Sequence, residues 1–509
     1  MVVKILILVI FFAVMILVGV NAKKKVNGVD DFVLGGRKIG PWMAAFSFGT
    51  SYFSAVIFVG YAGQFGWKFG IASTWIGLGN ALIGSMLAWV ILGRRTRVMT
   101  NHLSSSTMPD FFGKRYDSKA IKIAASAIAF VFLIPYTASV YNGLSKLFAL
   151  AFDIPYAAVV IGMAVLTGVY VILGGYMASS MNDFIQGMIM LIGIIAVIAS
   201  VLAGQGGFTE AIKSLANVQS AETVEQPGVF ASFFGPDPFG LLSVVVLTSL
   251  GTWGLPQMVQ KFYAIKDEKA IKTGTIVSTF FAIVIGGGSY FMGGFGRLFG
   301  AAEDFTVNGK MAYDGIVPAM LQNSLSDILI GVVVVLVLSA SMSTLSALVL
   351  TSSSTLTLDL LKGNIIKDMN QKKQLLIMRI MIVFFVAVSV IIALDPPTAI
   401  AQLMGISWGA LAGSFLAPFL YGLYWKKVTR PAVWVSFLSG VGITVASLFI
   451  DSLSPIVAGA AAMIAGLIIV PIVSAVTKNS QKDVNRVDNI FECYNVNITV
   501  KKSRQLSSD

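Results

Sequence analysis

The chain has 509 residues and a formal net charge of +12; hydrophobic residues make up 56% of it and charged residues 12%. Soluble domains carry roughly twice that share of charge, so the composition excludes a soluble enzyme of several domains. The one cysteine, Cys493, and the one histidine, His102, also exclude a disulfide framework, a Cys- or His-ligated metal centre and a histidine-based catalytic triad.

Long apolar runs recur along the whole chain, and a run of about 20 such residues can cross a bilayer as a helix. The sequence therefore predicts an all-α membrane protein. Thirteen segments qualify: 3–21, 41–65, 70–93, 123–150, 155–175, 184–204, 239–260, 273–296, 326–358, 375–394, 397–424, 431–450 and 454–476.

The first apolar segment, 3–21, could be mistaken for a secretory signal. Only Lys4 precedes the run, whereas Lys23, Lys24 and Lys25 follow it. This is the reverse of the charge pattern of a secretory signal. We therefore predict a retained anchor helix with its N-terminus outside.

The positive charges set the orientation of the segments. With the N-terminus outside, 30 of the 36 Lys and Arg residues fall in inward-facing stretches and 6 in outward-facing ones. Lys and Arg accumulate in cytoplasmic loops, so this asymmetry favours thirteen crossings and a cytoplasmic C-terminus in the cell membrane. It also explains the net charge without nucleic acid as a partner.

Four regions follow from this pattern. They are an anchor helix with its cytoplasmic loop (1–40), a transport core (41–425), two further helices (426–477) and a polar cytoplasmic tail (478–509). We expect the tail to be loosely ordered. Short amphipathic or re-entrant helices are expected in the outer loops 205–235 and 297–325.

Ionisable residues are nearly absent from the apolar segments. Asp183, at the start of the sixth, is the one carboxylate placed close to a helix body. Proton relays and voltage sensors need more such groups, so an ion inside the bilayer would have to be bound by neutral oxygens, which suits Na⁺. Asp183 itself fits two interpretations, a helix N-cap or a carboxylate beside a sodium exit route.

Two segments contain signals for a broken helix, and a break in a membrane is tolerated only where it lines a cavity or is buried in protein. Residues 47–55 combine a glycine with hydroxyl-bearing residues, and residues 251–257 hold two glycines and a proline. The breaks are five segments apart, which is typical of an inverted-repeat transporter with its site near the midplane. Glycines that only allow close helix packing are the alternative.

The ninth segment carries a run of hydroxyls. Ala340, Ser343 and Thr344 stand at i, i+3 and i+4 and so share one helix face. A carbonyl and two hydroxyls could converge there on an ion. Alternatively, the hydroxyls bond back to the preceding turn of their own helix.

Three stretches resemble the sodium/solute symporter family, which has a LeuT-type core. Residues 174–186 resemble its GG-x-x-A-x-x-x-x-D-x-x-Q motif, residues 340–344 its sodium-binding helix, and residues 254–256 with Phe262 its broken helix. The resemblance covers roughly residues 5–475. It implies a 5+5 inverted repeat of helices with one helix before it and two after it.

The resemblance also implies where sodium binds. The positions that match the family's common sodium site are Thr50, Phe53, Ala340, Ser343 and Thr344. Asp183 and Ser346 match a second sodium site, or a release path, of some members. Ala347 stands where those members have a hydroxyl, so we expect one sodium ion per cycle.

The substrate is expected near both breaks. The candidate residues are Tyr52, Ser54, Tyr136, Thr252, Trp253, Pro256 and Gln257. Tyr136 matches the sodium/proline branch, but Tyr52 and Val56 replace an aspartate and a tryptophan of that branch. Residues 50–55 and 178–183 are more similar to the sodium/pantothenate and monocarboxylate branch.

The sequence thus predicts a sodium-coupled symporter, functional as a monomer, that imports a small organic solute by alternating access. A carboxylate such as pantothenate or a monocarboxylate is expected, and proline or another amino acid is the alternative. A membrane enzyme would need a cluster of catalytic side chains at the interface, for which His102 and Asp110 are the only candidates. A solute sensor without transport is the non-transporter alternative, and it would need a larger output domain than the tail.

Overall fold

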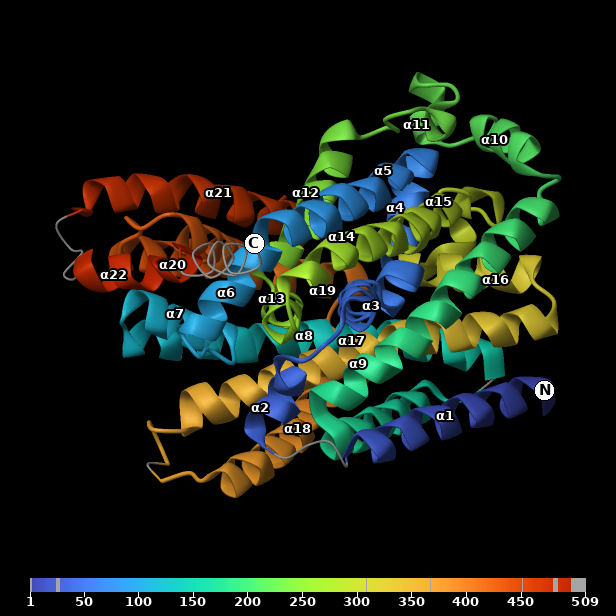
Figure 1. Cartoon of the computed structure of the whole chain (residues 1–509). Helices are drawn as coiled ribbons and strands as arrows, with labels where there is room; N and C mark the ends of the chain where they lie inside the picture. Colours follow the sequence, from blue (N-terminus) through green and yellow to red (C-terminus); the bar gives the residue numbers. More distant parts are fainter. Residues whose placement is uncertain are drawn as a thin grey trace, which may run out of the picture.

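A computed structural model describes residues 2–23, 28–152, 154–307, 309–366, 368–450, 452–478 and 484–495, and these residues are nearly all helical. Figure 1 shows long helices lying side by side, with short helices at both ends of the molecule. The only sheet in the described part is a hairpin of two short strands with two residues each, β1 (Thr306–Val307) and β2 (Lys310–Met311).

The helices of the first part of the chain reach to residue 204. They are α1 (Val2–Lys23), α2 (Val29–Leu34), α3 (Pro41–Tyr52), α4 (Ala62–Phe69), α5 (Thr74–Gly79), α6 (Arg94–His102), α7 (Met108–Tyr116), α8 (Lys119–Phe152) and α9 (Tyr156–Gly204). Wider π-helical turns join some of them into continuous spans: Val56–Tyr61 leads into α4, and Asn80–Leu87 with Trp89–Gly93 connects α5 to α6.

The second part begins with helices outside the bundle and ends with the tail. It contains α10 (Phe208–Ala216), α11 (Ala221–Glu225), α12 (Pro238–Gly254), α13 (Pro256–Ala264), α14 (Glu268–Ala282), α15 (Gly288–Gly293), α16 (Ile316–Ser324), α17 (Asp327–Thr355), α18 (Gln371–Leu394), α19 (Ile400–Tyr424), α20 (Arg430–Ala446), α21 (Pro455–Val476) and α22 (Val484–Phe491). A π-helical turn, Leu356–Leu361, extends α17.

Eight helices of the described residues are long and apolar enough to cross a membrane, nine if the bent pair α12 and α13 counts as one span, and Ile5–Asn21 and Arg430–Ala446 are shorter apolar helices. The helix α9 has 49 residues, so at 1.5 Å per residue it is about 74 Å long, more than twice the hydrocarbon thickness of about 30 Å. Its bend at Gly175, with φ +52°, separates the fifth and sixth predicted segments. The number of thirteen crossings remains a prediction.

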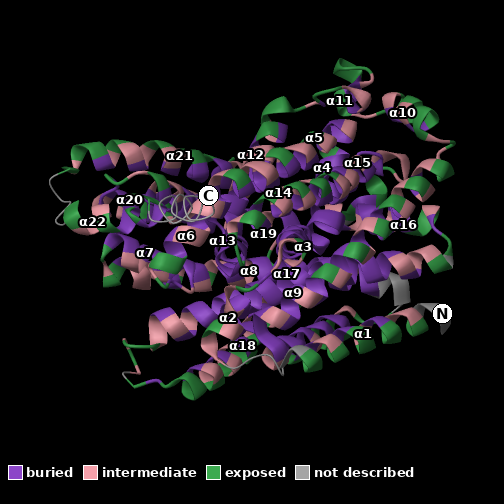
Figure 2. Cartoon of the chain, viewed as in Figure 1, coloured by how far each residue is buried: buried purple, intermediate pink, exposed green. Residues whose placement is uncertain are grey.

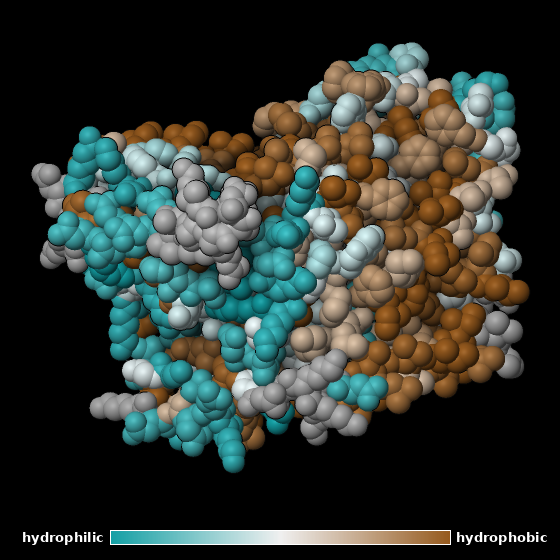
Figure 3. Space-filling model, viewed as in Figure 1, coloured by the Kyte–Doolittle hydropathy of each residue, from teal (hydrophilic) through white to brown (hydrophobic). Residues whose placement is uncertain are grey.

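The surface in Figure 3 separates into a hydrophilic end on the left and a broad hydrophobic region on the right. The start of α1 and the short helices α10 and α11 lie at the end opposite α7 and α22 (Figure 1), as an odd number of crossings requires. We call the end that carries α6, α7 and α22 the basic end, because it holds Arg94, Arg95, Arg115 and Lys426.

Burial is greatest in the middle of the bundle, around α3, α13, α17 and α19 (Figure 2). In the most apolar 18-residue window, 78% of residues are buried in the span of α17 and 89% in α19, against 28% in α18 and 33% in α9. Helices with exposed apolar faces are those that contact lipid in a membrane protein. The well-buried helices therefore line the interior, which is where a transport site must lie.

Two expectations from the sequence meet the structure here. The short helices α10 and α11 confirm the amphipathic helices expected in the first outer loop. The expectation of a loosely ordered tail is wrong for residues 484–495, because α22 packs on the basic end, where the Arg95 guanidinium lies between the rings of Tyr424 and Tyr494 at 4.4 and 4.3 Å. Residues 479–483 and 496–509 of the tail lie outside the described residues.

Candidate functional site

The first predicted break is present between α3 and α4. The helix α3 ends at Tyr52, and Phe53 has extended backbone angles, φ −105° and ψ 107°. The chain then resumes as a helical turn at Val56, whose N–H donates to the Ser54 hydroxyl at 3.2 Å. Helix ends leave backbone carbonyls without intrahelical partners, so the carbonyls of the last turn of α3 are free to bind other groups.

The second predicted break separates α12 from α13. Leu255 is extended, with φ −81° and ψ 122°, Pro256 begins α13, and the two helices are bent by 47°. The Tyr52 hydroxyl donates to the Thr248 carbonyl at 2.6 Å. This hydrogen bond joins the two broken helices, although their sequences are almost 200 residues apart.

Glycines allow the breaks to be packed this closely. A Cβ on Gly251 would lie 2.3 Å from the Trp408 ring, and one on Gly84 would lie 2.3 Å from the Tyr52 hydroxyl. Neither distance is possible for a real side chain. Both interpretations of the glycines therefore hold: they permit a break, and they bring neighbouring helices against it.

Five oxygens converge where α3 meets α17. The Ser343 hydroxyl lies 2.8 Å from the Thr50 carbonyl and 3.0 Å from the Ala340 carbonyl. The Thr344 hydroxyl lies 3.3 Å from the carbonyls of both Thr50 and Ser51, and 3.1 Å from that of Ala340. We call these five atoms the oxygen cluster; all five residues are fully buried.

The oxygen cluster contains four of the five residues at which the sequence predicts a sodium ion. The two hydroxyls also lie within hydrogen-bond distance of the Ala340 carbonyl in their own helix. The alternative interpretation, that they bond back to the preceding turn, therefore describes the same geometry. Phe53 lies in the extended segment, while Ser51 contributes the carbonyl that sequence reasoning missed. Its signal was its position in the last turn of α3, where a break frees more than one carbonyl.

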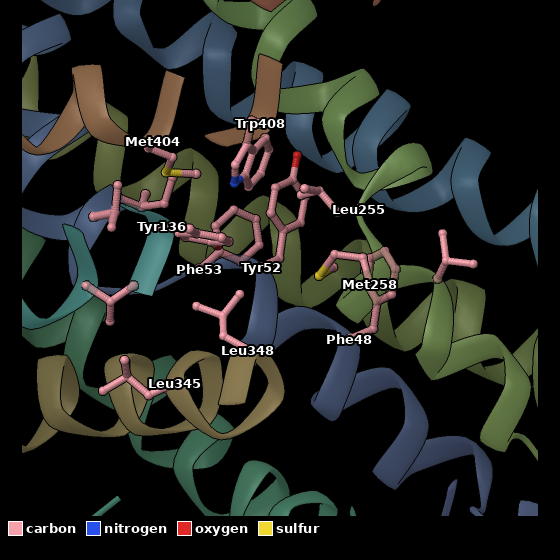
Figure 4. Close-up of a cluster of buried hydrophobic side chains, with 14 of the residues drawn as sticks. Phe48, Tyr52, Phe53, Tyr136, Leu255, Met258, Leu345, Leu348, Met404 and Trp408 are labelled. Carbon is pink, nitrogen blue, oxygen red and sulfur yellow. The ribbon is translucent and has the colours of Figure 1, made fainter. Parts of the chain in front are cut away.

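Four aromatic side chains lie together at the first break (Figure 4). The ring of Tyr52 stacks on Phe53 at 4.4 Å and faces Trp408 at 6.1 Å, and Trp408 lies 5.8 Å from Tyr136. We call these four residues the aromatic cluster. Trp408, from α19, was not predicted; its signal is a lone tryptophan among small residues, since Gly405 and Gly409 flank it.

The predicted substrate residues of the second break have two different environments. Thr252 donates to the Gly84 carbonyl at 2.8 Å, and the indole N–H of Trp253 donates to the Ile83 carbonyl at 3.0 Å. Both donors hold α12 against the neighbouring span, and the assignment of these two residues to the substrate stays a prediction. Pro256 begins α13. It directly follows Leu255, which belongs to the cluster of buried side chains in Figure 4.

Three polar side chains near the breaks have no hydrogen-bond partner among the described residues. They are the hydroxyl of Ser51, the amide of Gln257 and the indole N–H of Trp408. All three residues are at least 99% buried. Buried polar groups without partners are costly, so these three groups are candidates for contact with a bound ligand.

Asp183 is not a helix cap, which corrects one of its two predicted interpretations. It lies within α9, eight residues after the bend at Gly175. Its carboxylate accepts a hydrogen bond of 2.5 Å from the Ser47 hydroxyl and lies 3.7 Å from the Lys261 ammonium. The Lys261 ammonium in turn donates to the Ser47 hydroxyl at 2.7 Å.

Lys261 directly follows the predicted apolar segment 239–260, yet it is not a loop residue. It lies in the body of α13 and is 2% exposed. The expectation that Asp183 is the only carboxylate close to a helix body is corrected as well: Asp359, 1% exposed, extends α17 and pairs with Lys122 at 3.0 Å. The pairs Lys261–Asp183 and Lys122–Asp359 each join segments that are far apart in the sequence, so no local sequence pattern reveals them.

Ser346, the second residue matched to a further sodium site, has partners other than Asp183. Its hydroxyl shares a hydrogen bond of 2.7 Å with the Ser179 hydroxyl and lies 2.9 Å from the Ser343 carbonyl. No group of three or more His, Cys, Asp or Glu side chains that could hold a metal occurs among the described residues.

Comparisons with known proteins agree on one family. The model of the sodium:solute symporter family matches residues 32–440. The chain is 28% identical to the osmoregulated proline transporter of Bacillus subtilis, over 95% of this chain and 96% of that protein. It is 30% identical to the sodium/proline symporter of Haemophilus influenzae, over 84% of each chain.

Solved structures show the same fold. A Na⁺-coupled sialic acid symporter superposes with a TM-score of 0.76 at 16% identity, over 93% of this chain and 97% of the other. A nucleobase-cation-symport-1 family transporter, Mhp1, superposes with a TM-score of 0.53 at 13% identity, over 90% and 97%. The expected LeuT-like, all-α architecture is confirmed.

The relatives correct the expected branch. They are named as proline transporters and sodium/proline symporters, whereas residues 50–55 and 178–183 favoured the pantothenate and monocarboxylate branch. Residues 50–55 lie at the first break and residues 178–183 follow the bend of α9, so both stretches shape the backbone. They are therefore a poor guide to the solute.

Proposed function

This chain belongs to the sodium:solute symporter family, and we propose that it imports proline, or a similarly small zwitterionic amino acid, together with one sodium ion. The coupling to Na⁺ follows from the family. The solute is proposed from the names of the relatives and from the chemistry of the buried break region. The observation that carries the ion site is the convergence of five neutral oxygens from α3 and α17.

The oxygen cluster suits a monovalent hard cation. Oxygen ligands bind hard cations, and a site without a carboxylate offers too little negative charge to hold a divalent ion. The cluster joins α3, whose helix ends there, to the continuous helix α17. A cation bound between them would favour the conformations in which the two helices are in contact, which is how a ligand shifts a conformational equilibrium.

The aromatic cluster suits the two parts of proline that are not its carboxylate. The pyrrolidine ring is apolar, and the faces of Tyr52 and Trp408 present flat apolar surface. A secondary ammonium is attracted to the face of such rings by about 0.5–2 kcal/mol. A neutral aromatic environment therefore accepts a cationic nitrogen without an acidic partner, which this chain lacks at Tyr52.

The carboxylate of the solute has candidate partners at the breaks. The unpartnered hydroxyl of Ser51 and amide of Gln257 are donors of the required kind, and Gln257 stands in the first turn of α13. Backbone N–H groups at a helix N-terminus favour an anion. Together with Tyr52, Ser54, Tyr136 and Pro256, these residues form the proposed substrate site.

One sodium ion supplies enough energy for accumulation. Moving one charge through roughly 100 mV yields about 2.3 kcal/mol, and a tenfold concentration ratio costs about 1.4 kcal/mol. The membrane potential alone therefore supports roughly fortyfold accumulation of a zwitterion with one Na⁺. Alternating access would move the broken helices against the helices that surround them and release both ligands on the other side.

The experiment that tests the solute is competition for uptake. Purified protein in liposomes is given labelled proline under an inward Na⁺ gradient, with unlabelled proline, alanine, pantothenate, pyruvate, lactate or acetate in hundredfold excess. We expect only amino acids to compete, with proline the strongest. Competition by a carboxylate without an amino group, or no proline uptake at all, would contradict the proposed solute while leaving the ion site to be tested separately.

A further inference from the structure

We propose that the Lys261 ammonium acts as a tethered cation beside Asp183 and excludes a second sodium ion, so that Lys261 fixes the coupling at one Na⁺ per solute. This inference rests on the proposed function. It concerns a residue that neither the oxygen cluster nor the aromatic cluster contains. It follows from the contacts of three buried side chains on three different helices: Ser47 of α3, Asp183 of α9 and Lys261 of α13.

The three side chains form a closed chain of contacts. Lys261 donates to Ser47 at 2.7 Å, Ser47 donates to Asp183 at 2.5 Å, and the ammonium lies 3.7 Å from the same carboxylate oxygen. The ammonium also lies 5.2 Å from the centre of the Tyr176 ring. Asp183 and Ser47 are fully buried, and Lys261 is 2% exposed.

The charges in this cluster balance without any bound ion. A buried carboxylate needs a positive partner, because an unpaired charge in a low-dielectric interior is strongly unfavourable. The Lys261 ammonium supplies one positive charge for the one negative charge of Asp183. A sodium ion bound to the same carboxylate would leave a net positive charge at a buried site.

One oxygen of the carboxylate is left for a second cation. The second carboxylate oxygen of Asp183, Oδ1, has no partner among the described residues. Asp183 thus retains one atom that could bind a cation, and the nearby ammonium opposes that binding by charge repulsion.

The direct test compares sodium stoichiometry in wild type and in variants of this cluster. The variants are Lys261→Met, which keeps the length of the side chain and removes its charge, Lys261→Met with Asp183→Asn, which removes both charges, and the matched control Lys261→Arg. The flux ratio of ²²Na⁺ to labelled proline is measured in proteoliposomes at pH 8.5, where protonation of a carboxylate is disfavoured. Equilibrium ²²Na⁺ binding to the purified proteins gives the number of sites without requiring transport.

We expect one Na⁺ per proline and one binding site in wild type, in Lys261→Arg and in the double variant. We expect two sites in Lys261→Met, with the Hill coefficient for Na⁺ in uptake rising from about 1 towards 2. A wild type that binds or moves two sodium ions would overturn the proposal, and this measurement needs no variant. So would a Lys261→Met protein that binds one ion.

The outcomes separate this proposal from the proposed function. If wild type moves no proline, the proposed solute fails, but the count of sodium sites in wild type and Lys261→Met still decides the role of Lys261. If Lys261→Met folds but does not transport, the binding measurement decides alone. If that variant cannot be purified, Lys261→Gln takes its place under the same expectation.

Discussion

At the scale of single residues, the proposed ion site depends on two hydroxyls that the sequence predicts to lie on one helix face. Ser343 and Thr344 share a face with Ala340 because of the helical period, and this local rule holds in α17. Their partner, Thr50, lies almost 300 residues earlier. Its carbonyl is available only because α3 ends there, which the glycine and hydroxyls of residues 47–55 also predicted.

Ser343→Ala combined with Thr344→Ala should raise the sodium concentration for half-maximal uptake at least tenfold. Removing two of five oxygens costs at least about 1.4 kcal/mol of ion binding, which is one factor of ten. Uptake of labelled proline against Na⁺ concentration measures this. The matched control is Ser353→Ala, which removes a buried hydroxyl of the same helix that is bonded only to the Leu350 carbonyl; equal sodium dependence in the two proteins would contradict the site.

Tyr52→Phe should raise the KM for the solute while shifting the thermal midpoint of the protein only slightly. The variant keeps the ring and removes the hydrogen bond of 2.6 Å that joins α3 to α12, a loss of about 1 kcal/mol. Tyr116→Phe is the control, because that hydroxyl makes a bond of the same length to the Pro418 carbonyl at the basic end. We expect similar small shifts in the thermal midpoint of both proteins and a higher KM only in Tyr52→Phe.

The residues that the sequence did not reveal share one physical cause. Ser51, Trp408 and Lys261 acquire their roles from contacts with segments far away in the chain. A lysine five residues after a helix-initiating proline has the same local pattern whether α13 faces water or the protein interior. Only the packing of α13 against α3 and α9 makes Lys261 a buried cation.

At the scale of helices, glycine and proline predicted both breaks, because they act on the backbone itself. The bend of α9 at Gly175 separates two segments that were already predicted apart. The docking of α22 could not be predicted, since its contacts are stacking interactions of Arg95 and Arg115 with rings of the tail. The composition of the tail alone favoured disorder.

Gly254→Ala should destabilise the protein by about 1–3 kcal/mol and reduce transport, because an added Cβ would lie 2.8 Å from the backbone of α19 at Ala412 and Leu416. Backbone cannot move aside as a flexible side chain can. The control is Gly168→Ala in α9, where a Cβ would meet nothing within 4 Å. Thermal unfolding in detergent and proline uptake compare the two, and equal behaviour would show that the second break does not depend on close contact with α19.

The docking of α22 should keep Cys493 unreactive. Burial raises the pKa of its thiol to about 11, so at pH 8 only about one thiol in a thousand is ionised, and the thiolate is the reactive form. Because the chain has one cysteine, maleimide labelling reports on this site alone. Tyr494→Ala, which removes the ring stacked on Arg95, should lower this pKa towards its ordinary value and speed labelling at least tenfold.

Two comparisons complete this labelling experiment. Lys213→Ala, on an exposed helix at the other end of the molecule, should leave the labelling rate unchanged. Raising the pH from 8 to 10 should increase the rate in wild type continuously, because the thiol pKa lies above this range. Rapid labelling of wild type at pH 8 would contradict the docked position of α22.

At the scale of the whole molecule, composition predicted an all-α membrane protein, the two breaks indicated an inverted repeat, and the resemblance of three stretches implied the LeuT-type core. A chain with 56% hydrophobic residues and breaks five segments apart has few architectures that satisfy every backbone group in lipid. The same features do not identify the solute. Its binding depends on a few contacts in one buried region, which composition and charge do not describe.

The most direct test of the central claim is accumulation of labelled proline in proteoliposomes under an inward Na⁺ gradient. With valinomycin and an outward K⁺ gradient of fiftyfold, which sets an inside-negative potential near 100 mV, we expect uptake well above equilibrium that collapses when a sodium ionophore is added. Potassium or protons replacing sodium outside should give no accumulation. Equal uptake in the absence of sodium would contradict sodium-coupled symport.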